Sequence, residues 1–574
     1  MKINPNRLSL MLILFVFTSL NAQIGYHWVG SVNDDFLQPA NWSPVGVPTI
    51  NDTAYIHPAG PDCFDPVLNG SHYLHFITMK LGSKLVINGD LLIMGRLVIE
   101  ANGRTNGQLV LENKNSIIIY TIRIDWHFEP GEWNFFSLPF DGSSFYTSII
   151  SSGTIRRPVF GQYTNPLPTD DVYLVTYDGK RRYETNVASS SGGVNWVSVQ
   201  PDTVSNQYNT RVHHWMSRYK GYLLHTASDT GTLVIRFTPI NSNEIENVAY
   251  RNSRDDQHSF VNYWDSEAAS TNVHANWNFF STGLFGDFYT DSLYEHPEGN
   301  PLIMYYYNPE TSTYVAFRNT DALKIKCYTP MFYQASAPEL VIRRNACVSR
   351  PQSVPFVSVR REQLGFQVQL SQDSKTDVTG IEFAATSHPE YQINEDAVKM
   401  MSPRPEIPLL WTVNKGIRMA IHSTPDSLSG VRLGFRAGSA GRYRLSLVPD
   451  KDRRHSAILW LTDRNTGRKC NLTQEDYYFE VAQPLTDERR FEVCYLPSQI
   501  TGLAEDPTTL RFIPTRGGMY CAGVSAPVRV YVYSVTGSVV KRLENVTNGE
   551  KIDLAPGVYV VATRDGMMRK VSIP

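Results

Sequence analysis

The chain has 574 residues, and its 53 Lys and Arg nearly balance its 55 Asp and Glu, which leaves a formal net charge of −2. This length exceeds what one hydrophobic core serves, so several domains are expected. The near-neutral charge gives no field that would attract a polyanion, and no nucleic-acid partner is expected. With 31 Tyr, 38 Gly and 34 Pro, the composition favours short strands joined by turns. It predicts an all-β, multi-domain fold.

Residues 1–22 have the three parts of a secretory signal peptide. Lys2 and Arg7 carry positive charge, an apolar run extends from Leu8 to Leu20, and Ala22 precedes Gln23 at a small-residue cleavage site. The apolar run is shorter than the roughly 20 residues that a membrane-spanning helix needs. A signal peptide cleaved between Ala22 and Gln23 is therefore preferred over a membrane anchor.

Short apolar triplets recur in the N-terminal region. Leu85-Val86-Ile87, Leu91-Leu92-Ile93 and Leu97-Val98-Ile99 follow one another at six-residue intervals, and Leu109-Val110-Leu111 comes two intervals later. Stacked strands of a β-solenoid would produce such a period. A meander of tight hairpins would also produce it, because periodicity alone does not separate the two. We prefer a β-solenoid-like domain over residues 23–125.

The next region contains one module twice, and we call the two occurrences copy 1 (126–250) and copy 2 (251–347). Trp133-Asn134-Phe135-Phe136-Ser137 opens copy 1, and Trp277-Asn278-Phe279-Phe280-Ser281 opens copy 2. In each copy an aromatic strand that enters a turn follows, at 172–179 and at 304–309. An apolar strand then closes each copy, at 220–224 and at 329–333. Three elements in the same order indicate an internal duplication. A Pro- and Ser-containing linker at 348–355 precedes alternating strands that predict a β-sandwich at 356–498.

Residues 501–574 carry the most specific pattern. A strand and turn contain Tyr533 and Gly537, a second turn and strand contain Pro556, Gly557 and Tyr559, and Gly566 and Lys570 lie near the end. The turns and the alternating Val and Tyr predict a small antiparallel β-sandwich. This pattern resembles the type A C-terminal sorting domain of the type IX secretion system. The duplicated module resembles a β-sandwich-like module of proteins exported by that system, and residues 356–498 resemble the sandwich that often precedes the sorting domain.

The resemblance implies Sec-dependent export and then delivery to the cell surface or the medium. It implies recognition by the type IX secretion machinery, removal of the C-terminal domain by the sortase of that machinery, and either release or attachment to surface lipopolysaccharide. We expect a structural or adhesive, non-catalytic role in contact with glycan or protein ligands, without a cofactor. The alternative is a surface hydrolase or carbohydrate-binding protein that acts on polysaccharide or protein.

The sequence contains no convincing nucleophile, metal or carboxylate motif, so no catalytic, cofactor-binding or metal-binding residue is expected. Aromatic side chains can stack on sugar rings, and the candidates are Trp126, Trp133, Trp215 and Trp277. Core packing is expected at the duplicated positions Trp133 and Trp277, because a repeated position in a duplicated module usually belongs to the scaffold.

Two kinds of covalent modification are also expected. Asp-Ser/Thr-aliphatic triplets resemble the O-glycosylation signal of bacteria that use this secretion route, and the acceptors would be Thr53, Thr203, Ser292 and Ser427. Six cysteines in an oxidising compartment permit disulfides without requiring them. The pairs to test are Cys327 with Cys347 and Cys470 with Cys494.

Overall fold

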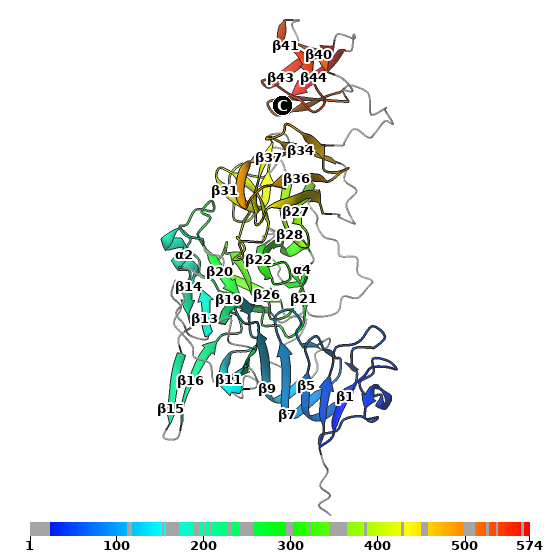
Figure 1. Ribbon diagram of the computed structural model, residues 1–574, viewed down its shortest axis with the longest axis vertical. Helices are drawn as coiled ribbons and strands as arrows, with labels where there is room; N and C mark the ends of the chain where they lie inside the picture. The colour runs from blue at the N-terminus through cyan, green and yellow to red at the C-terminus, as the bar shows by residue number, and fades with distance from the viewer. Residues whose placement is uncertain are drawn as a thin grey trace, which may run out of the picture. The chain divides into compact units, whose positions relative to one another are not determined.

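The structure is a computed structural model in which the chain forms two compact units (Figure 1). Unit 1 comprises residues 1–361 and 391–407, and unit 2 comprises residues 362–390 and 408–574. The structure describes residues 23–111, 117–151, 154–156, 172–188, 194–199, 201–206, 209–226, 232–239, 257–293, 302–321, 323–343, 364–383, 387–425, 430–448, 457–497, 511–523, 527–534, 538–563 and 568–574. The predicted signal peptide lies outside this part. Strands make up most of the described chain, and they confirm the all-β, multi-domain fold class.

A parallel β-solenoid begins unit 1. One face is formed by β1 (Gly25–Trp28), β3 (Thr53–Ile56), β5 (His72–Met79), β7 (Leu91–Ala101) and β9 (Ile117–Phe128), each parallel to the next. A second face is formed by β4 (Val67–Leu68), β6 (Lys84–Ile87) and β8 (Gln108–Leu111), also parallel. Near the start, η1 (Pro39–Asn41) leads into β2 (Trp42–Ser43), which pairs antiparallel with β1. Hairpins would pair antiparallel throughout, so the parallel ladders decide in favour of the solenoid.

The six-residue spacing of the apolar triplets does not separate successive rungs. The triplets that start at Leu91 and Leu97 both lie in β7, which shifts register between Ile93 and Arg96. Gly95 lies in this irregularity, where an added Cβ would come within 2.4 Å of the His75 ring. Both triplets therefore face the core from one bent strand. Neighbouring rungs are a full coil apart, as the pairing of β6 with β8 shows.

The last solenoid strand is also the first strand of copy 1. β9 pairs antiparallel with β18 (Thr232–Pro239), which pairs with β11 (Gly142–Ser151). The same sheet continues through β12 (Thr154–Arg156), β16 (Asn209–Met216) and β15 (Pro201–Asn206). The sheet thus crosses the boundary expected between residues 125 and 126. Its antiparallel strands cover the end of the solenoid, whose last parallel strand would otherwise present unpaired backbone.

Each copy contains a four-stranded antiparallel sheet. In copy 1 the strand order is β10 (Trp133–Phe136), β17 (Tyr222–Thr226), β13 (Val172–Tyr177) and β14 (Trp196–Ser198). In copy 2 it is β20 (Trp277–Phe280), β25 (Met331–Gln334), β22 (Ile303–Asn308) and β23 (Thr313–Arg318). In both sheets the opening strand pairs with the closing strand, which pairs with the aromatic strand. The two sheets have the same topology, as the internal duplication predicts.

The duplication extends to flanking strands that the sequence pattern did not include. In copy 2, β19 (Gln257–Val261) pairs with β26 (Glu339–Arg343) as β9 pairs with β18, and β21 (Phe288–Tyr289) pairs with β24 (Lys324–Ile325) as β11 pairs with β16. The helices differ between the copies. α2 (Gly179–Thr185) follows β13 in copy 1, whereas α4 (Thr290–Leu293) and η2 (Asn319–Asp321) lie in copy 2.

Unit 2 begins with a β-sandwich. The strands are β27 (Leu364–Gln372), β28 (Lys375–Phe383), β30 (Leu409–Asn414), β31 (Ile417–Thr424), β32 (Val431–Ala437), β33 (Gly441–Leu447), β34 (Ala457–Asp463), β35 (Lys469–Asn471), β36 (Tyr477–Val481) and β37 (Leu485–Pro497). They form one sheet in the order β35-β34-β37-β32-β30-β31-β28-β27-β33-β36. Phe479 of the terminal strand β36 contacts Phe435 of β32 and Phe491 of β37, at 5.3 and 4.8 Å between ring centroids. The sheet therefore folds over on itself to enclose a core.

The sandwich expected over 356–498 is interrupted. Residues 391–407, with β29 (Ala397–Val398), belong to unit 1, although they connect β28 to β30 in the chain. The segment from Asp396 to Lys399, which contributed to the resemblance of this region to a sandwich, is therefore not part of its core. The sequence analysis missed the boundaries of residues 391–407 because no change in composition marks so short a segment.

The C-terminal part of unit 2 is a small antiparallel sandwich, as predicted. A three-stranded sheet contains β38 (Arg511–Thr515), β39 (Gly518–Ala522) and β42 (Lys551–Asp553). A four-stranded sheet has the order β41 (Val539–Val546), β40 (Val528–Ser534), β43 (Gly557–Thr563) and β44 (Met568–Ile573). Alternate residues fill the core, which includes Val530, Val532, Val561 and Val571.

A buried histidine makes the stability of the unit 2 sandwich depend on pH. Burial lowers the pKa of His422 in β31 to about 4. In the unfolded chain a histidine titrates at about 6.5, so the stabilising contribution of neutral His422 is complete above that pH and is lost as the pH falls toward 4. Between pH 7 and pH 5 we expect it to decrease the free energy of unfolding by about 2 kcal/mol.

Urea unfolding of His422→Leu at both pH values tests this expectation. The variant should lose less stability on acidification than the parent protein, because leucine has no proton to bind. Equal losses in the two proteins would assign the acid sensitivity to other groups.

Candidate functional site

The two copies contact each other through equivalent residues. Phe135 and Phe279, which occupy the same motif position, have ring centroids 6.2 Å apart. The hydroxyls of Ser137 and Ser281, also equivalent, share a hydrogen bond of 2.8 Å. Contacts between equivalent residues are what a two-fold axis produces in a symmetric dimer. The copies therefore pack as an internal pair with approximate two-fold symmetry.

The aromatic contacts around this axis follow the same symmetry. Phe135 stacks on Tyr307 of copy 2 at 4.7 Å, and Phe279 meets Tyr177 of copy 1 at 6.5 Å. Tyr177 and Tyr307 are equivalent, since each lies two residues after a matching strand position, Val175 paired with Leu223 and Tyr305 paired with Phe332. The neighbouring contacts match as well, with 5.8 Å for Phe135–Tyr314 and 5.5 Å for Phe279–Trp196.

On one side of the axis the interface is closed by backbone hydrogen bonds. The N–H of Gly221 donates to the carbonyl of Phe279 at 3.3 Å, and the N–H of Ser281 donates to the carbonyl of Tyr219 at 3.1 Å. Gly221 has no side chain, and an added Cβ would lie 2.5 Å from the Phe279 ring. The closing segment of copy 1 can therefore lie directly against the opening strand of copy 2.

Helix α2 covers Trp277 on this closed side. The guanidinium carbon of Arg182 lies 3.9 Å from the centroid of a Trp277 ring, a cation–π contact. The helix approaches so closely that a Cβ on Gly179 would lie 1.7 Å from the Trp277 carbonyl oxygen. Trp277 is consequently fully buried.

The equivalent contact on the other side of the axis is not made. The residue equivalent to Gly221 is Pro330, because Tyr222 and Met331 hold matching positions against the two opening strands. Proline has no N–H to donate to the Phe135 carbonyl. A solenoid turn lies there instead, where Asn106 Nδ2 donates to the Cys327 carbonyl at 2.9 Å. The symmetry is therefore broken at this point.

A cleft of about 220 Å³ opens where the symmetry is broken. Its walls come from the solenoid turn at 102–104, the opening strand of copy 1, the turn after β22, residues 324–330 and Arg404. The cleft is lined by both aromatic rings and charged groups, among them Trp133, Phe135, Tyr307, Glu129, Arg104 and Arg404. Such a mixture suits a ligand that has both apolar faces and polar or charged groups.

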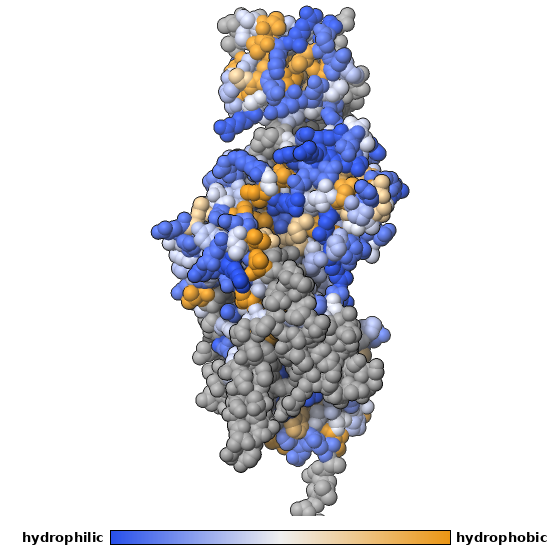
Figure 2. Space-filling view, turned by 60° about the vertical axis from the view of Figure 1, so that its left-hand side comes forward, coloured by the Kyte–Doolittle hydropathy of each residue, from blue (hydrophilic) through white to orange (hydrophobic). Residues whose placement is uncertain are grey.

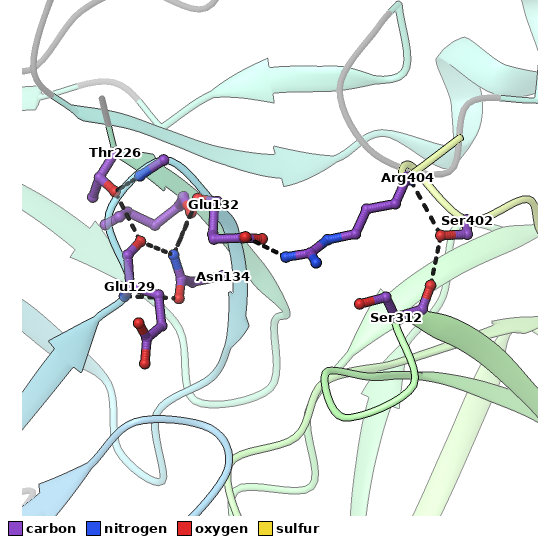
Figure 3. Close-up of polar contacts among 9 residues, drawn as sticks. Glu129, Glu132, Asn134, Thr226, Ser312, Ser402 and Arg404 are labelled. Carbon is purple, nitrogen blue, oxygen red and sulfur yellow. Dashed lines mark hydrogen bonds and ion pairs between the residues drawn. The ribbon is translucent and has the colours of Figure 1, made fainter. Parts of the chain in front are cut away.

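Asn134 holds the loop that carries two of the three carboxylates of the cleft, Glu129 and Glu132 (Figure 3). Its Nδ2 donates to the carbonyls of Glu129 and Glu132, both at 3.1 Å, and its Oδ1 accepts the N–H of Glu129 at 3.2 Å. The hydroxyl of Thr226 donates to the same Glu129 carbonyl at 2.9 Å. The loop is thus fixed by side chains from β10 and β17.

Asn278 makes the same bonds in copy 2. Its Nδ2 donates to the carbonyls of Tyr263 and Asn276, at 3.0 and 2.9 Å, and its Oδ1 accepts the N–H of Tyr263 at 2.8 Å. This shared clamp explains why asparagine follows tryptophan in both motifs. Tyr263 exchanges with Asn278 the same two hydrogen bonds that Glu129 exchanges with Asn134, so Tyr263 is the counterpart of Glu129.

Residues 391–407 complete the wall of the cleft (Figure 3). Arg404 forms an ion pair with Glu132, and this hydrogen-bonded carboxylate raises the pKa of the guanidinium. Ser402 places the arginine, because its hydroxyl donates to the Ser312 carbonyl at 2.5 Å and accepts the Arg404 N–H at 3.2 Å. The Glu129 carboxylate points away from Arg404, is exposed, and makes no ion pair with a described cation.

The four candidate tryptophans have different surroundings. Trp126 and Trp277 are buried, so neither can stack on a ligand, and Trp215 is 41% exposed. Trp133 is half-buried, contacts His225 at 4.8 Å and lines the cleft. The expectation of core packing is therefore confirmed for Trp277 and wrong for Trp133. The sequence interpretation also missed Glu129 and Arg404, and Arg404 lies too far along the chain from its partner for a local pattern to link them.

The described residues of the predicted sorting motif gather on one sheet of the C-terminal sandwich. Tyr533 of β40 and Lys570 of β44 both pair with Val560 of β43. Gly557 begins β43, and Tyr559 Oη donates to the Ala555 carbonyl at 2.9 Å.

The hydrogen bond from Tyr559 to Ala555 spans the turn at Pro556. Gly537 and Gly566 lie outside the described residues. Figure 2 shows apolar surface on this sandwich, at the top of the view. Val539, Val540 and Val558 are among its exposed residues.

The predicted modification sites are only partly described. Gln23 is the first described residue and Ala22 lies before it. Thr53 begins β3, is half-buried, and its hydroxyl accepts the Gln23 side-chain amide at 2.8 Å. The side chains of Thr203 and Ser292, and the whole of Ser427, lie outside the described part of the chain.

The predicted disulfide between Cys470 and Cys494 is wrong. Both are free thiols, on β35 and β37, and β34 lies between these strands. Two strand spacings are about 9.5 Å, whereas the Cα atoms of a disulfide are about 4.4 to 6.8 Å apart. Cys327 is buried, and Cys347 lies outside the described residues, so this second pairing stays a prediction.

Over the described ranges, no three His, Cys, Asp or Glu residues are grouped as a metal site would require. No helix in the same ranges is long and apolar enough to span a membrane. Comparison of the chain with protein-family models and with curated proteins finds no match to either.

Replacing Asn134 by alanine should loosen the cleft. With its three hydrogen bonds to Glu129 and Glu132 lost, we expect backbone amides in residues 129–134 to exchange with deuterium about tenfold faster. Asn278→Ala is the matched control, since it should accelerate exchange at 263–278 and leave 129–134 unchanged. Unchanged exchange at 129–134 in Asn134→Ala would show that the loop does not depend on this clamp.

Thiol labelling of the folded protein should distinguish the cysteines. Cys63 is exposed and should react with a maleimide at pH 7, whereas burial raises the pKa of Cys470 and of Cys494 to about 11. Mass spectrometry should find both of these labelled only after unfolding without reductant. Failure to label them even then would indicate the disulfide after all.

Proposed function

We propose that this protein is an exported surface or secreted protein of the type IX secretion pathway, non-catalytic and adhesive, which binds an external ligand in the cleft beside Trp133. The observation that carries the export proposal is the small antiparallel sandwich at the C-terminus. Tyr533, Gly557, Tyr559 and Lys570 of the sorting motif lie together on its four-stranded sheet. A receptor that recognises a folded domain needs such a preformed surface.

On this proposal the C-terminal sandwich is a secretion signal. The secretion machinery recognises it, the sortase removes it within the segment that precedes β38, and the remaining protein is released or attached to lipopolysaccharide. Exposed Val539 and Val558 on the four-stranded sheet give this domain an apolar surface for contact with the machinery.

The adhesive role follows from the architecture of unit 1. The solenoid and copy 1 share one continuous sheet, and copy 2 is joined to copy 1 by the backbone hydrogen bonds of Gly221 and Ser281, so the cleft walls are held in place. Trp133 and Phe135 offer ring surfaces, while Glu129 and Arg104 offer charge. A rigid cleft of this composition can bind a glycan or a polypeptide without a conformational change.

A hydrolytic role is less well supported by the same cleft. Glu129 and Glu132 are the two carboxylates that a glycosidase would need. Glu132 is engaged in an ion pair with Arg404, and Glu129 is exposed to solvent. A glycosidase needs one carboxyl group enclosed in apolar surroundings as its general acid, and the exposed Glu129 side chain is not enclosed. Binding is therefore the favoured function.

Truncation tests the export proposal. We expect the full chain, expressed in a bacterium that has type IX secretion, to reach the surface or the medium and to lack residues 511–574 by intact mass. A chain that ends at Ser498 should stay in the periplasm. If both chains reach the same compartment and the full chain keeps its C-terminus, the export proposal is wrong.

A further inference from the structure

On the closed side of the two-fold interface, helix α2 of the chain itself is bound in the way that we expect an external ligand to be bound in the cleft. There, α2 lies on Trp277 and Tyr263, and a Cβ on Gly179 would be 3.3 Å from the Tyr263 ring. Arg182 of α2 binds in this site through its guanidinium. Its guanidinium stacks on Trp277 and donates hydrogen bonds of 3.2 Å to the Tyr177 hydroxyl and to the Val273 carbonyl.

The open cleft presents the counterparts of the two residues that α2 covers. Trp133 corresponds to Trp277 by the shared motif, and Glu129 corresponds to Tyr263 by the shared asparagine clamp. Copy 2 has no counterpart of α2 to fill the cleft. Its aromatic strand turns back at once, since Asn308 pairs with Thr313.

The two sides also differ in charge. A carboxylate, Glu129, stands in the cleft where the closed side has the phenol of Tyr263. Among the other charged groups nearby, Arg404 pairs with Glu132 and Lys326 pairs with Glu310 at 2.9 Å, whereas Arg104 makes no ion pair with a described residue. A carboxylate beside a tryptophan ring favours a guanidinium, which can stack and donate paired hydrogen bonds at once.

We propose that the cleft binds an arginine side chain of a polypeptide from outside this chain, held against Trp133 and Glu129 as Arg182 is held against Trp277. The proposal rests on the adhesive function and names its ligand class. Because Arg104 also lines the cleft, the ligand is a segment with an acidic residue close to its arginine, as Glu184 is close to Arg182 in α2.

A synthetic peptide with the sequence of residues 177–187 is the probe. Titration calorimetry with the full chain should detect binding of this peptide, and the peptide with Arg182→Ala should bind about threefold to thirtyfold more weakly. In the protein, Glu129→Gln and Trp133→Leu should weaken binding of the parent peptide by a similar factor. Glu267→Gln, a change of an exposed carboxylate in copy 2, is the matched control and should have no effect.

Glu129→Gln keeps the shape of the side chain, so it separates loss of binding from loss of folding. If the peptide does not bind, or if it binds Glu129→Gln and Glu267→Gln equally, the arginine proposal is overturned. Glycan-array binding that is lost in Trp133→Leu, without peptide binding, would likewise overturn it and identify a saccharide as the ligand. Neither result would affect the secretion test, which depends on unit 2 alone.

Discussion

The contact between equivalent residues at the internal two-fold axis is the interaction on which the rest of unit 1 depends. Phe135 and Phe279 face each other there, and Ser137 hydrogen-bonds to Ser281. Each copy alone has a four-stranded sheet with one aromatic face, which a small sheet cannot leave in water. Pairing the copies buries both faces at once, and the motif that opens each copy supplies both the strand and the contact.

The solenoid both completes and disturbs this symmetric pair. Because β9 is at once the last rung and the first strand of copy 1, the solenoid needs no separate cap. Its turn at 102–107 lies on only one side of the axis, where Asn106 donates to the Cys327 carbonyl and Tyr328 Oη donates to the Gly107 carbonyl. One interface is closed as a result, while the other keeps a cleft. The cleft proposed as the binding site thus lies where the duplicated scaffold departs from its own symmetry.

The cleft also depends on a segment from far along the chain. Arg404 belongs to residues 391–407, which leave the sandwich sequence and pack within unit 1. There Ser402 and Arg404 bond to Ser312 and Glu132, so the segment engages one of the three carboxylates of the cleft in an ion pair. Glu129 is exposed and makes no ion pair with a described cation. The charge distribution in the cleft therefore depends on the ion pair that residues 391–407 form with Glu132 and not with Glu129.

Local patterns in the sequence determined the all-β class, the duplicated strands and the small C-terminal sandwich, because alternation and turn residues act over a few positions. They left solenoid and meander undecided, since rungs and hairpins share one periodicity. Tertiary structure alone decided the pairing of β9 with β18, the separation of Cys470 from Cys494, and the meeting of Trp133, Glu129 and Arg404. These depend on strand neighbours and on contacts between segments distant in the chain, and no local spacing encodes such proximity. Equivalent motifs predicted equivalent burial for Trp133 and Trp277, and only the packing of α2 and of the solenoid turn made their surroundings different.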